Sequence, residues 1–192
     1  MKKIILIGGG GHCKSVIDVI EQEGKFKIAG IVDKNKRIDI KVLGYPVIGN
    51  DFDLENLRKK YEYAFITVGQ TSSSLLRVKL FTLIKQKNFC IPVIISPNAY
   101  VSNYAKIGFG TIVMHNAVVN ANVSIGENCI INTSALVEHD CKISNHCHIS
   151  TNATINGGVT VGPECFIGSN VTTNNNIKIE KKKFIKAGSL VK

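Results

Sequence analysis

Aliphatic residues recur at every sixth position through the second half of the chain. The series is interrupted only by Thr173, and its aliphatic members are Val101, Ile107, Val113, Val119, Ile125, Ile131, Val137, Ile143, Ile149, Ile155, Val161, Ile167, Ile179, Ile185 and Val191. The residue four positions after each is mostly small, as at Ala117, Cys141 and Ala153. A period of six does not fit the helical repeat of about 3.6 residues, whereas it fits a short strand followed by a turn. The pattern therefore predicts a parallel β-helix, a prism whose aliphatic side chains stack inward from coil to coil.

The first half of the chain follows a different pattern, in which short apolar runs alternate with segments of helical spacing. We expect strands at residues 2–7, 26–32, 63–68 and 91–95, and helices at residues 14–23 and after a cap at 72–74. This alternation indicates a parallel α/β sheet of the Rossmann type. Because Ser96-Pro97 follows the last of these strands, we expect two domains, an α/β half-domain at 1–95 and an all-β prism at 96–192.

The cysteines follow the period of the repeat. Cys129, Cys141, Cys147 and Cys165 are separated by multiples of six, and the chain has no Cys-x-x-Cys pair. This is not the spacing of a zinc site, so we expect small buried thiols in the prism and no metal.

Charge and hydropathy narrow the class of protein further. The net charge is +10, but no basic stripe with interleaved aromatic residues appears, so nucleic acid is not expected as a partner. The run Lys181-Lys182-Lys183 either forms a solvated turn or attracts a ligand that carries several phosphates. No apolar run approaches the roughly 18 residues of a membrane span. The apolar run at residues 4–7 is too short for a signal peptide, which favours a cytoplasmic protein.

A glycine-rich loop separates the first strand from the first helix. At Gly10 and Gly11, backbone amides of a helix N-terminus can approach a phosphate, and His12 ends the loop. Asp33 lies about 20 residues further on, where a Rossmann unit places its ribose-binding acid. Cys13 takes the place of the third glycine of that fingerprint, and only one mononucleotide half is present. A nucleotide or nucleotide sugar is therefore favoured over a dinucleotide, with a purely structural turn as the remaining alternative.

A histidine between two acids is the strongest candidate for catalysis. His139 lies between Glu138 and Asp140, two positions after the inward Val137, so its imidazole is expected to point out of the prism. A surface histidine without function is the alternative interpretation.

Several motifs in order along the chain, GGGGH, VDKN, VGQ, NTSALVEHDC and HCHIS, resemble the bacterial sugar acyltransferases. That family includes UDP-4-amino-sugar N-acetyltransferases and sialic-acid O-acetyltransferases, and the resemblance covers the whole chain. It implies a left-handed β-helix with three hexads in each coil, a homotrimer, and acetyl-CoA bound between neighbouring prisms. It also implies that the α/β domain binds a nucleotide sugar and that the prism carries out acyl transfer.

The resemblance assigns roles to individual residues. His139 matches the catalytic base, Asp140 matches the acid that raises its basicity, and Asn132 matches a contact to the acceptor. With three hexads in a coil, Gly157 lies one coil above His139, where we expect its exposed N–H to stabilise the oxyanion. The remaining matches are Gly10, Gly11, His12, Asp33, Lys34 and Gly69 for the sugar nucleotide, and His148, Ser169 and Ala187 for acetyl-CoA. Relatives often continue into a Gly-x-Pro-Ala-Lys-like tail, so here the adenine contact is expected to come from elsewhere.

These roles predict direct acetyl transfer from acetyl-CoA to the 4-amino group of a UDP-linked sugar, in bacterial glycan or glycoprotein biosynthesis. No residue needs to be acylated. The close alternative is an O-acetyltransferase acting on sialic acid or a related nonulosonic acid. A non-catalytic trimeric scaffold and a dinucleotide sensor or dehydrogenase fragment are alternatives from other classes.

Overall fold

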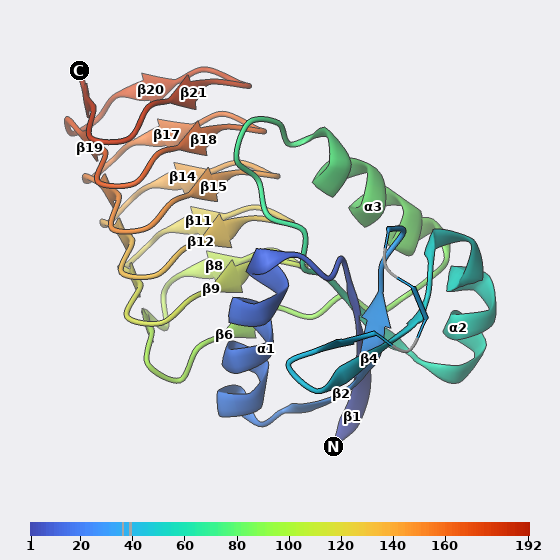
Figure 1. Cartoon of the computed structure of the whole chain (residues 1–192). Coiled ribbons are helices and arrows are strands. Elements are labelled where there is room, and N and C mark those ends of the chain that lie inside the picture. The colour runs from blue at the N-terminus through green and yellow to red at the C-terminus, as the bar shows by residue number, and fades with distance from the viewer. Residues whose placement is uncertain (36, 39) are drawn as a thin grey trace. The chain divides into compact units, whose positions relative to one another are not determined.

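The computed structural model describes residues 1–35, 37, 38 and 40–192, which form two compact units (Figure 1). The first unit consists of Met1–Gly69 and Leu75–Pro92 and is called the α/β unit below. The second consists of Gln70–Ser74 and Val93–Lys192. In the second unit, Val93–Lys192 is called the prism and Gln70–Ser74 the strap. Within the described part of the chain, no helix combines the length and apolar character that crossing a membrane requires.

The α/β unit is built on a five-stranded sheet with the order β3-β4-β2-β1-β5. Its strands are β1 (Lys2–Ile7), β2 (Phe26–Val32), β3 (Lys41–Val42), β4 (Tyr45–Gly49) and β5 (Tyr63–Ile66). Strands β1, β2, β4 and β5 pair in parallel, and β3 pairs antiparallel to β4. The predicted parallel α/β sheet is therefore confirmed, although the short β3 and β4 carry no periodic signal and were not predicted.

Three α-helices belong to the same unit. They are α1 (Gly11–Glu23), α2 (Leu54–Lys60) and α3 (Leu75–Gln86), and a 3₁₀ turn, η1 (Asp51–Asp53), precedes α2. Helix α1 begins three residues earlier than predicted, because the extended Gly10 serves as its N-cap, and it ends at the left-handed Gly24. Helix α2 was not predicted.

The strand predicted at residues 91–95 is wrong in both length and sheet. Only Ile94–Ile95 (β6) is a strand, and it pairs with β9 of the prism. The physical reason lies in the repeat, because Ile95 is one hexad before Val101 and already occupies an inward position.

The prism consists of two-residue strands that form three parallel sheets, and its coils are stacked in Figure 1 from β6 towards the C-terminus. Sheet one contains β7 (Tyr100–Val101), β10 (Val118–Val119), β13 (Leu136–Val137), β16 (Thr154–Ile155), β19 (Thr172–Thr173) and β22 (Leu190–Val191). Sheet two contains β8 (Lys106–Ile107), β11 (Ser124–Ile125), β14 (Lys142–Ile143), β17 (Thr160–Val161) and β20 (Lys178–Ile179). Sheet three contains β6, β9 (Ile112–Val113), β12 (Ile130–Ile131), β15 (His148–Ile149), β18 (Phe166–Ile167) and β21 (Phe184–Ile185).

Each strand pairs with the strand 18 residues along the chain, as Val119 does with Val137 and Ile125 with Ile143. Three hexads therefore make one coil, and the prism is a left-handed β-helix as expected. The second residue of each strand points inward, and all of these residues except the buried Thr173 contribute to a continuous apolar core. Cys129, Cys141, Cys147 and Cys165 are free thiols with no exposed surface, which confirms the prediction of buried thiols.

The turns repeat as regularly as the strands. The residue three positions after each inward aliphatic has a positive φ from residue 110 to residue 188, and asparagine often occupies it. Asparagine and aspartate tolerate this left-handed conformation better than other residues with a side chain. Asp140 stands at such a position with a φ of 62°.

Candidate active site

The His139–Asp140 pair lies at the corner of the prism between β13 and β14. The imidazole is exposed as predicted, and its Nδ1 lies 2.8 Å from Asp140 Oδ2. Asn122 lies one coil below Asp140, and its Nδ2 donates to Asp140 Oδ1 at 2.7 Å. The hydrogen bonds from Asn122 and His139 hold the pKa of the Asp140 carboxyl below its ordinary value of 3.8. Because a carboxylate only accepts, Nδ1 carries the proton and Nε2 is left with a lone pair that can take a proton.

Gly157 lies one coil above, in the place where the imidazole needs room. A Cβ on Gly157 would approach His139 Cε1 and Nε2 to 2.8 Å, so the ring rests on the glycine backbone. Gly157 is consequently buried, and the expectation of an exposed N–H is wrong because the ring itself covers this position. The neighbouring Gly158 has a φ of 71°, and its N–H donates to His139 O at 3.0 Å.

The residues matched to the acceptor and the cofactor lie on sheet three and at the corner that follows it. His148 is 6% exposed, with its Nδ1 2.7 Å from Gln70 O and its Nε2 3.0 Å from Asn132 Nδ2. Asn132 Oδ1 accepts from Thr133 N at 2.8 Å. The structure therefore brings Asn132 and His148 into direct contact.

Ser169 and Ala187 occupy the same position in successive coils, at the corner where Asn132 lies. Gly188 N donates to Ser169 O at 2.9 Å, and the hydroxyls of Ser169 and Ser150 are 3.0 Å apart. Asn132 precedes strand β13 and His139 follows it, so His139 and the predicted cofactor residues lie at the two corners that flank sheet one.

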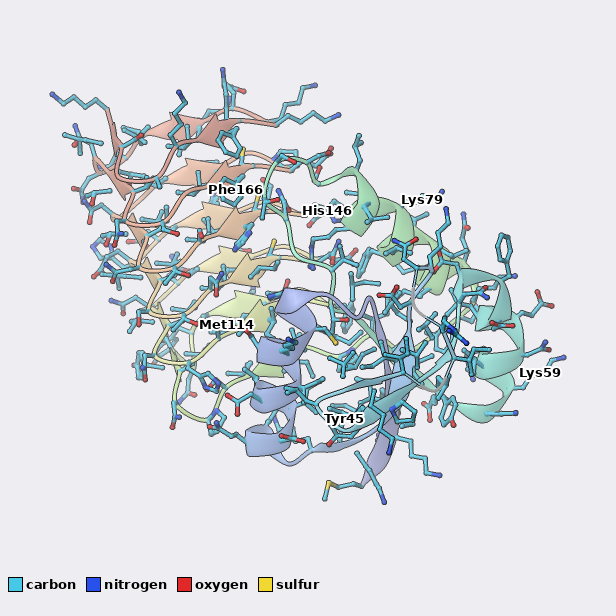
Figure 2. All side chains as sticks on the ribbon, viewed as in Figure 1. Tyr45, Lys59, Lys79, Met114, His146 and Phe166 are labelled. Atoms are coloured by element: carbon cyan, nitrogen blue, oxygen red, sulfur yellow. The ribbon has the colours of Figure 1, made fainter. Side chains whose placement is uncertain are left out.

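Sequence reasoning missed a stack of aromatic rings on sheet three. The ring of Phe166 meets His148 edge-on at 5.2 Å and stacks on Phe184 at 4.9 Å, with 10° between the two phenyl planes. Phe184 belongs to the last strand of its sheet and is 51% exposed, and Lys183 directly precedes it. Phe166 is labelled on this part of the prism in Figure 2. The signal was present, because these three positions are 18 residues apart.

The loops at the carboxyl ends of β1, β2 and β5 bring the predicted sugar-nucleotide residues together. Gly9 N donates to Asp33 Oδ2 at 2.6 Å, and Asn35 N donates to Asp33 Oδ1 at 2.9 Å. Both carboxylate oxygens therefore accept hydrogen bonds from the backbone of these loops. Asp33 thus has a structural role that does not require a bound ribose. A Cβ added to Gly10 or Gly11 would meet no atom within 4 Å, which leaves space for a ligand at the N-terminus of α1.

The other residues predicted for this ligand lie at the same edge of the sheet. A Cβ on Gly69 would lie 3.4 Å from His12 Cβ, so the loop after β5 meets the first turn of α1. Lys34 is exposed directly after Asp33. Open α/β sheets bind ligands outside the carboxyl ends of their strands, at the point where the strand order reverses, and β1 lies at that point here.

Among residues 1–35, 37, 38 and 40–192, no cluster of three histidine, cysteine or acidic side chains is arranged to hold a metal ion.

Comparison with known proteins places these observations in a family. The model of the PglD N-terminal domain matches residues 3–81, and the bacterial transferase hexapeptide model matches residues 104–139 and 140–175. Perosamine N-acetyltransferase from Caulobacter crescentus, solved with CoA and GDP-perosamine, is 34% identical with a TM-score of 0.93, over 100% of this chain and 89% of that one. The acetyltransferase domain of PglB from Neisseria gonorrhoeae is 31% identical with a TM-score of 0.90, over 100% of this chain and 92% of that one.

A more distant structure, WeeI from Acinetobacter baumannii, is 20% identical with a TM-score of 0.77, over 99% of this chain and 96% of that one, and supports the fold alone. No curated protein matches the chain. The fold and the site together define a hexapeptide-repeat acyltransferase. The chain belongs to the bacterial sugar acyltransferase family, in which a PglD-type N-terminal domain precedes the hexapeptide repeats.

Proposed function

We propose that this protein is an acetyl-CoA-dependent N-acetyltransferase that acetylates the 4-amino group of a UDP-linked sugar, with His139 as general base. The observation that carries the proposal is the imidazole of His139, which is exposed, oriented through Nδ1 by Asp140 and seated on Gly157. The proposed setting is bacterial glycan or glycoprotein biosynthesis in the cytoplasm.

The geometry supports direct transfer. The neutral amine attacks the thioester carbonyl, and His139 Nε2 takes the amine proton as the C–N bond forms. When the C–S bond breaks, the imidazolium returns that proton to the departing thiolate of CoA. Asp140 keeps Nδ1 protonated and stabilises the imidazolium. A positioned base of this kind contributes about 10²–10⁴-fold to the rate.

We place acetyl-CoA along the corner that carries Ser169 and Ala187. The ring of Phe184, which is 51% exposed, would support the adenine ring. Lys183 would attract the phosphates of CoA. Phe184 and Lys183 are thus our proposed contacts to the adenine end of CoA.

We further propose that the site is assembled between copies in a homotrimer. The base and the cofactor residues flank sheet one, so two prisms that pack side by side would bring the base of one to the cofactor residues of the next. The outward residues of sheet one support this packing. Val118 and Leu136 are apolar and half-buried, and Tyr100 and Leu190 are 60% and 57% exposed.

The α/β domain, proposed as residues 1–95, would hold the nucleotide, and the prism domain, residues 96–192, would transfer the acetyl group. The proposed nucleotide contacts are Gly10, Gly11, His12, Asp33, Lys34 and Gly69. The Caulobacter relative was solved with GDP-perosamine, so a GDP-linked 4-amino sugar is the nearest competitor to a UDP-linked one.

The test is release of CoA thiol from acetyl-CoA with three acceptors: a UDP-linked 4-amino sugar, GDP-perosamine and free sialic acid. We expect turnover with the UDP-linked amine and a loss of at least about 100-fold in His139→Ala. His146→Ala is the matched control, because this second corner histidine lies outside the proposed site and should leave the rate unchanged. Turnover with GDP-perosamine alone would show that the acceptor is linked to GDP instead of UDP. Turnover with sialic acid alone would support the O-acetyltransferase alternative. Silence with all three acceptors, together with failure to bind CoA, would refute the enzymatic proposal.

A further inference from the structure

We propose that His148 is a positioning residue. Its neutral imidazole, held in one tautomer by a backbone carbonyl of the strap, fixes the orientation of the side-chain amide of Asn132. The proposal rests on the proposed function, in which Asn132 contacts the acceptor. It concerns contacts within the second unit only, namely those joining the strap, strand β15 and the turn after strand β12.

The strap is anchored at both of its ends. Gln70 is 2% exposed, and its Nε2 donates to Cys165 O at 3.4 Å. At the other end of the strap, Ser74 Oγ donates to Glu164 Oε2 at 2.7 Å. Glu164 also pairs with Lys182 at 3.6 Å. These contacts hold the backbone carbonyl of Gln70 against the His148 ring.

That carbonyl determines where the imidazole proton lies. A carbonyl oxygen only accepts hydrogen bonds, so the contact of 2.7 Å requires His148 Nδ1 to be the donor. In a neutral imidazole the other nitrogen is then an acceptor. At 3.0 Å from Asn132, His148 Nε2 therefore receives a hydrogen bond from Asn132 Nδ2.

A second, independent contact requires the same orientation of Asn132. Thr133 N is a donor and lies 2.8 Å from Asn132 Oδ1, so the amide oxygen must face the backbone and the NH₂ group must face His148. One N–H of that NH₂ group binds His148, and the other is left to meet a ligand. The orientation of Asn132 is thus determined from both sides.

This arrangement changes the role that the family resemblance gave to His148. Its two nitrogens already have partners within the chain and its surface is 6% exposed, so we propose the positioning of Asn132 as its role in place of a hydrogen bond to acetyl-CoA. A second proton on the ring would place two donors face to face at Asn132. His148 therefore serves by staying neutral, in contrast to His139, which serves by taking a proton.

The first arm of the test needs no substrate. In the full chain labelled with ¹⁵N at histidine, the two ring nitrogens of His148 have distinct shifts in each tautomer, and the signals missing from His148→Gln identify them. We expect a protonated Nδ1 and an unprotonated Nε2 at neutral pH. A protonated Nε2, in either the other tautomer or the imidazolium, overturns the proposal.

The second arm compares two replacements of His148. The amide of His148→Gln retains one donor and one acceptor, whereas His148→Phe retains neither. We expect His148→Gln to be at least about tenfold more active than His148→Phe, with the loss in kcat/KM for the acceptor and an unchanged KM for acetyl-CoA. Equal activity of the two variants, or a loss confined to the KM for acetyl-CoA, overturns the proposal.

The third arm is Asn132→Asp, whose carboxylate cannot donate to Nε2. We expect about a tenfold loss in kcat/KM for the acceptor and a protonated Nε2 in the ¹⁵N spectrum. Asn128→Asp is the matched control, since Asn128 Nδ2 lies 3.0 Å from His146 Nδ1 at a different corner. Unchanged His148 shifts in Asn132→Asp overturn the relay even if the variant is inactive. No turnover by the wild type with any acceptor, together with failure to bind CoA, refutes the proposed function instead, and the ¹⁵N arms still decide the role of His148.

Discussion

The prism and the α/β unit hold their candidate functional groups in different ways. In the prism, strands pair with a register of 18 residues, and this register fixes the position of each side chain. The neighbours of His139 in the adjacent coils are therefore the residues 18 positions before and after it. In the α/β unit, the glycine loop and Asp33 meet because the two strands that precede them, β1 and β2, end at the same edge of the sheet. Repetition thus supplies rigidity in one unit, and a few specific contacts between loops supply it in the other.

The largest effect on activity is expected from Gly157→Ala, which tests whether the register positions the base. The new Cβ would lie 2.8 Å from two atoms of the imidazole and would push it aside. A displacement of about 1 Å in a catalytic group can cost about 100-fold in rate, so we expect a loss of that order in kcat.

Alanine itself fits this turn, since Ala121 occupies the same position one coil below His139. The free energy of unfolding should therefore change little in Gly157→Ala, as measured by urea denaturation. Full activity in this variant would contradict the proposed seat of the ring.

In the α/β unit the corresponding test is Gly8→Ala, which should act on stability. Gly8 has a φ of 105°, and an added Cβ would clash with the side chain of Val68. We expect the free energy of unfolding of this unit to fall by at least about 1–3 kcal/mol from backbone strain.

Gly10→Ala is the matched control, because its Cβ would point into open space. This control should keep the stability of the wild type and lose affinity for the nucleotide sugar. Equal stability losses in the two variants would show that the loop is not held as described.

Asp140→Asn tests the orientation of the base with a smaller expected effect. Asparagine keeps the short side chain that suits the left-handed backbone, but it removes the charge that stabilises the imidazolium. We expect about a tenfold loss in kcat. An unchanged rate would show that Asp140 does not act on His139.

The pH dependence of Asp140 has a definite sign. Because its folded pKa lies below 3.8, the carboxylate persists as the pH falls to that value, and its contribution to stability is lost only as the pH falls through the lower, folded pKa. Asn122→Ala should raise this pKa towards the ordinary value, since Asn122 is the larger cause of the shift. The ¹³C shift of the Asp140 carboxyl, followed against pH, measures it.

The smallest effect is expected from Phe184→Ala at the last coil. Loss of the stacking face should raise the KM for acetyl-CoA by up to about tenfold and leave the KM for the acceptor unchanged. Tyr104→Ala is the control, because this exposed ring lies in the first coils of the prism. Equal effects of the two variants would contradict the proposed binding of adenine at Phe184.

The sequence predicted most of what depends on the repeat. The inward aliphatics, the buried cysteines and the outward imidazole of His139 all follow from a period of six, because a strand and turn of fixed length place each residue relative to its neighbours. The strand at residues 91–95 was misassigned although Ile95 follows the same period of six, because the repeat was not extended one hexad before Val101.

Contacts between segments far apart in the chain could not be predicted from the sequence. The pattern could not show that Gln70 contributes its carbonyl to His148, 78 residues away, or that both oxygens of Asp33 close the glycine loop. It also predicted an exposed Gly157 N–H, because spacing gives the position of a residue and not the volume that a neighbouring ring fills.

The sequence by itself determined the prism and the face on which His139 lies, since strand and turn preferences repeated at a constant length place each residue relative to its neighbours. The three hexads in each coil and the left hand of the prism were implied by the family resemblance. Only the tertiary structure decided the tautomer of His148 and the orientation of Asn132. Those depend on a donor and acceptor chain contributed by separate segments, and the direction of each hydrogen bond is known only when all of its partners are in place.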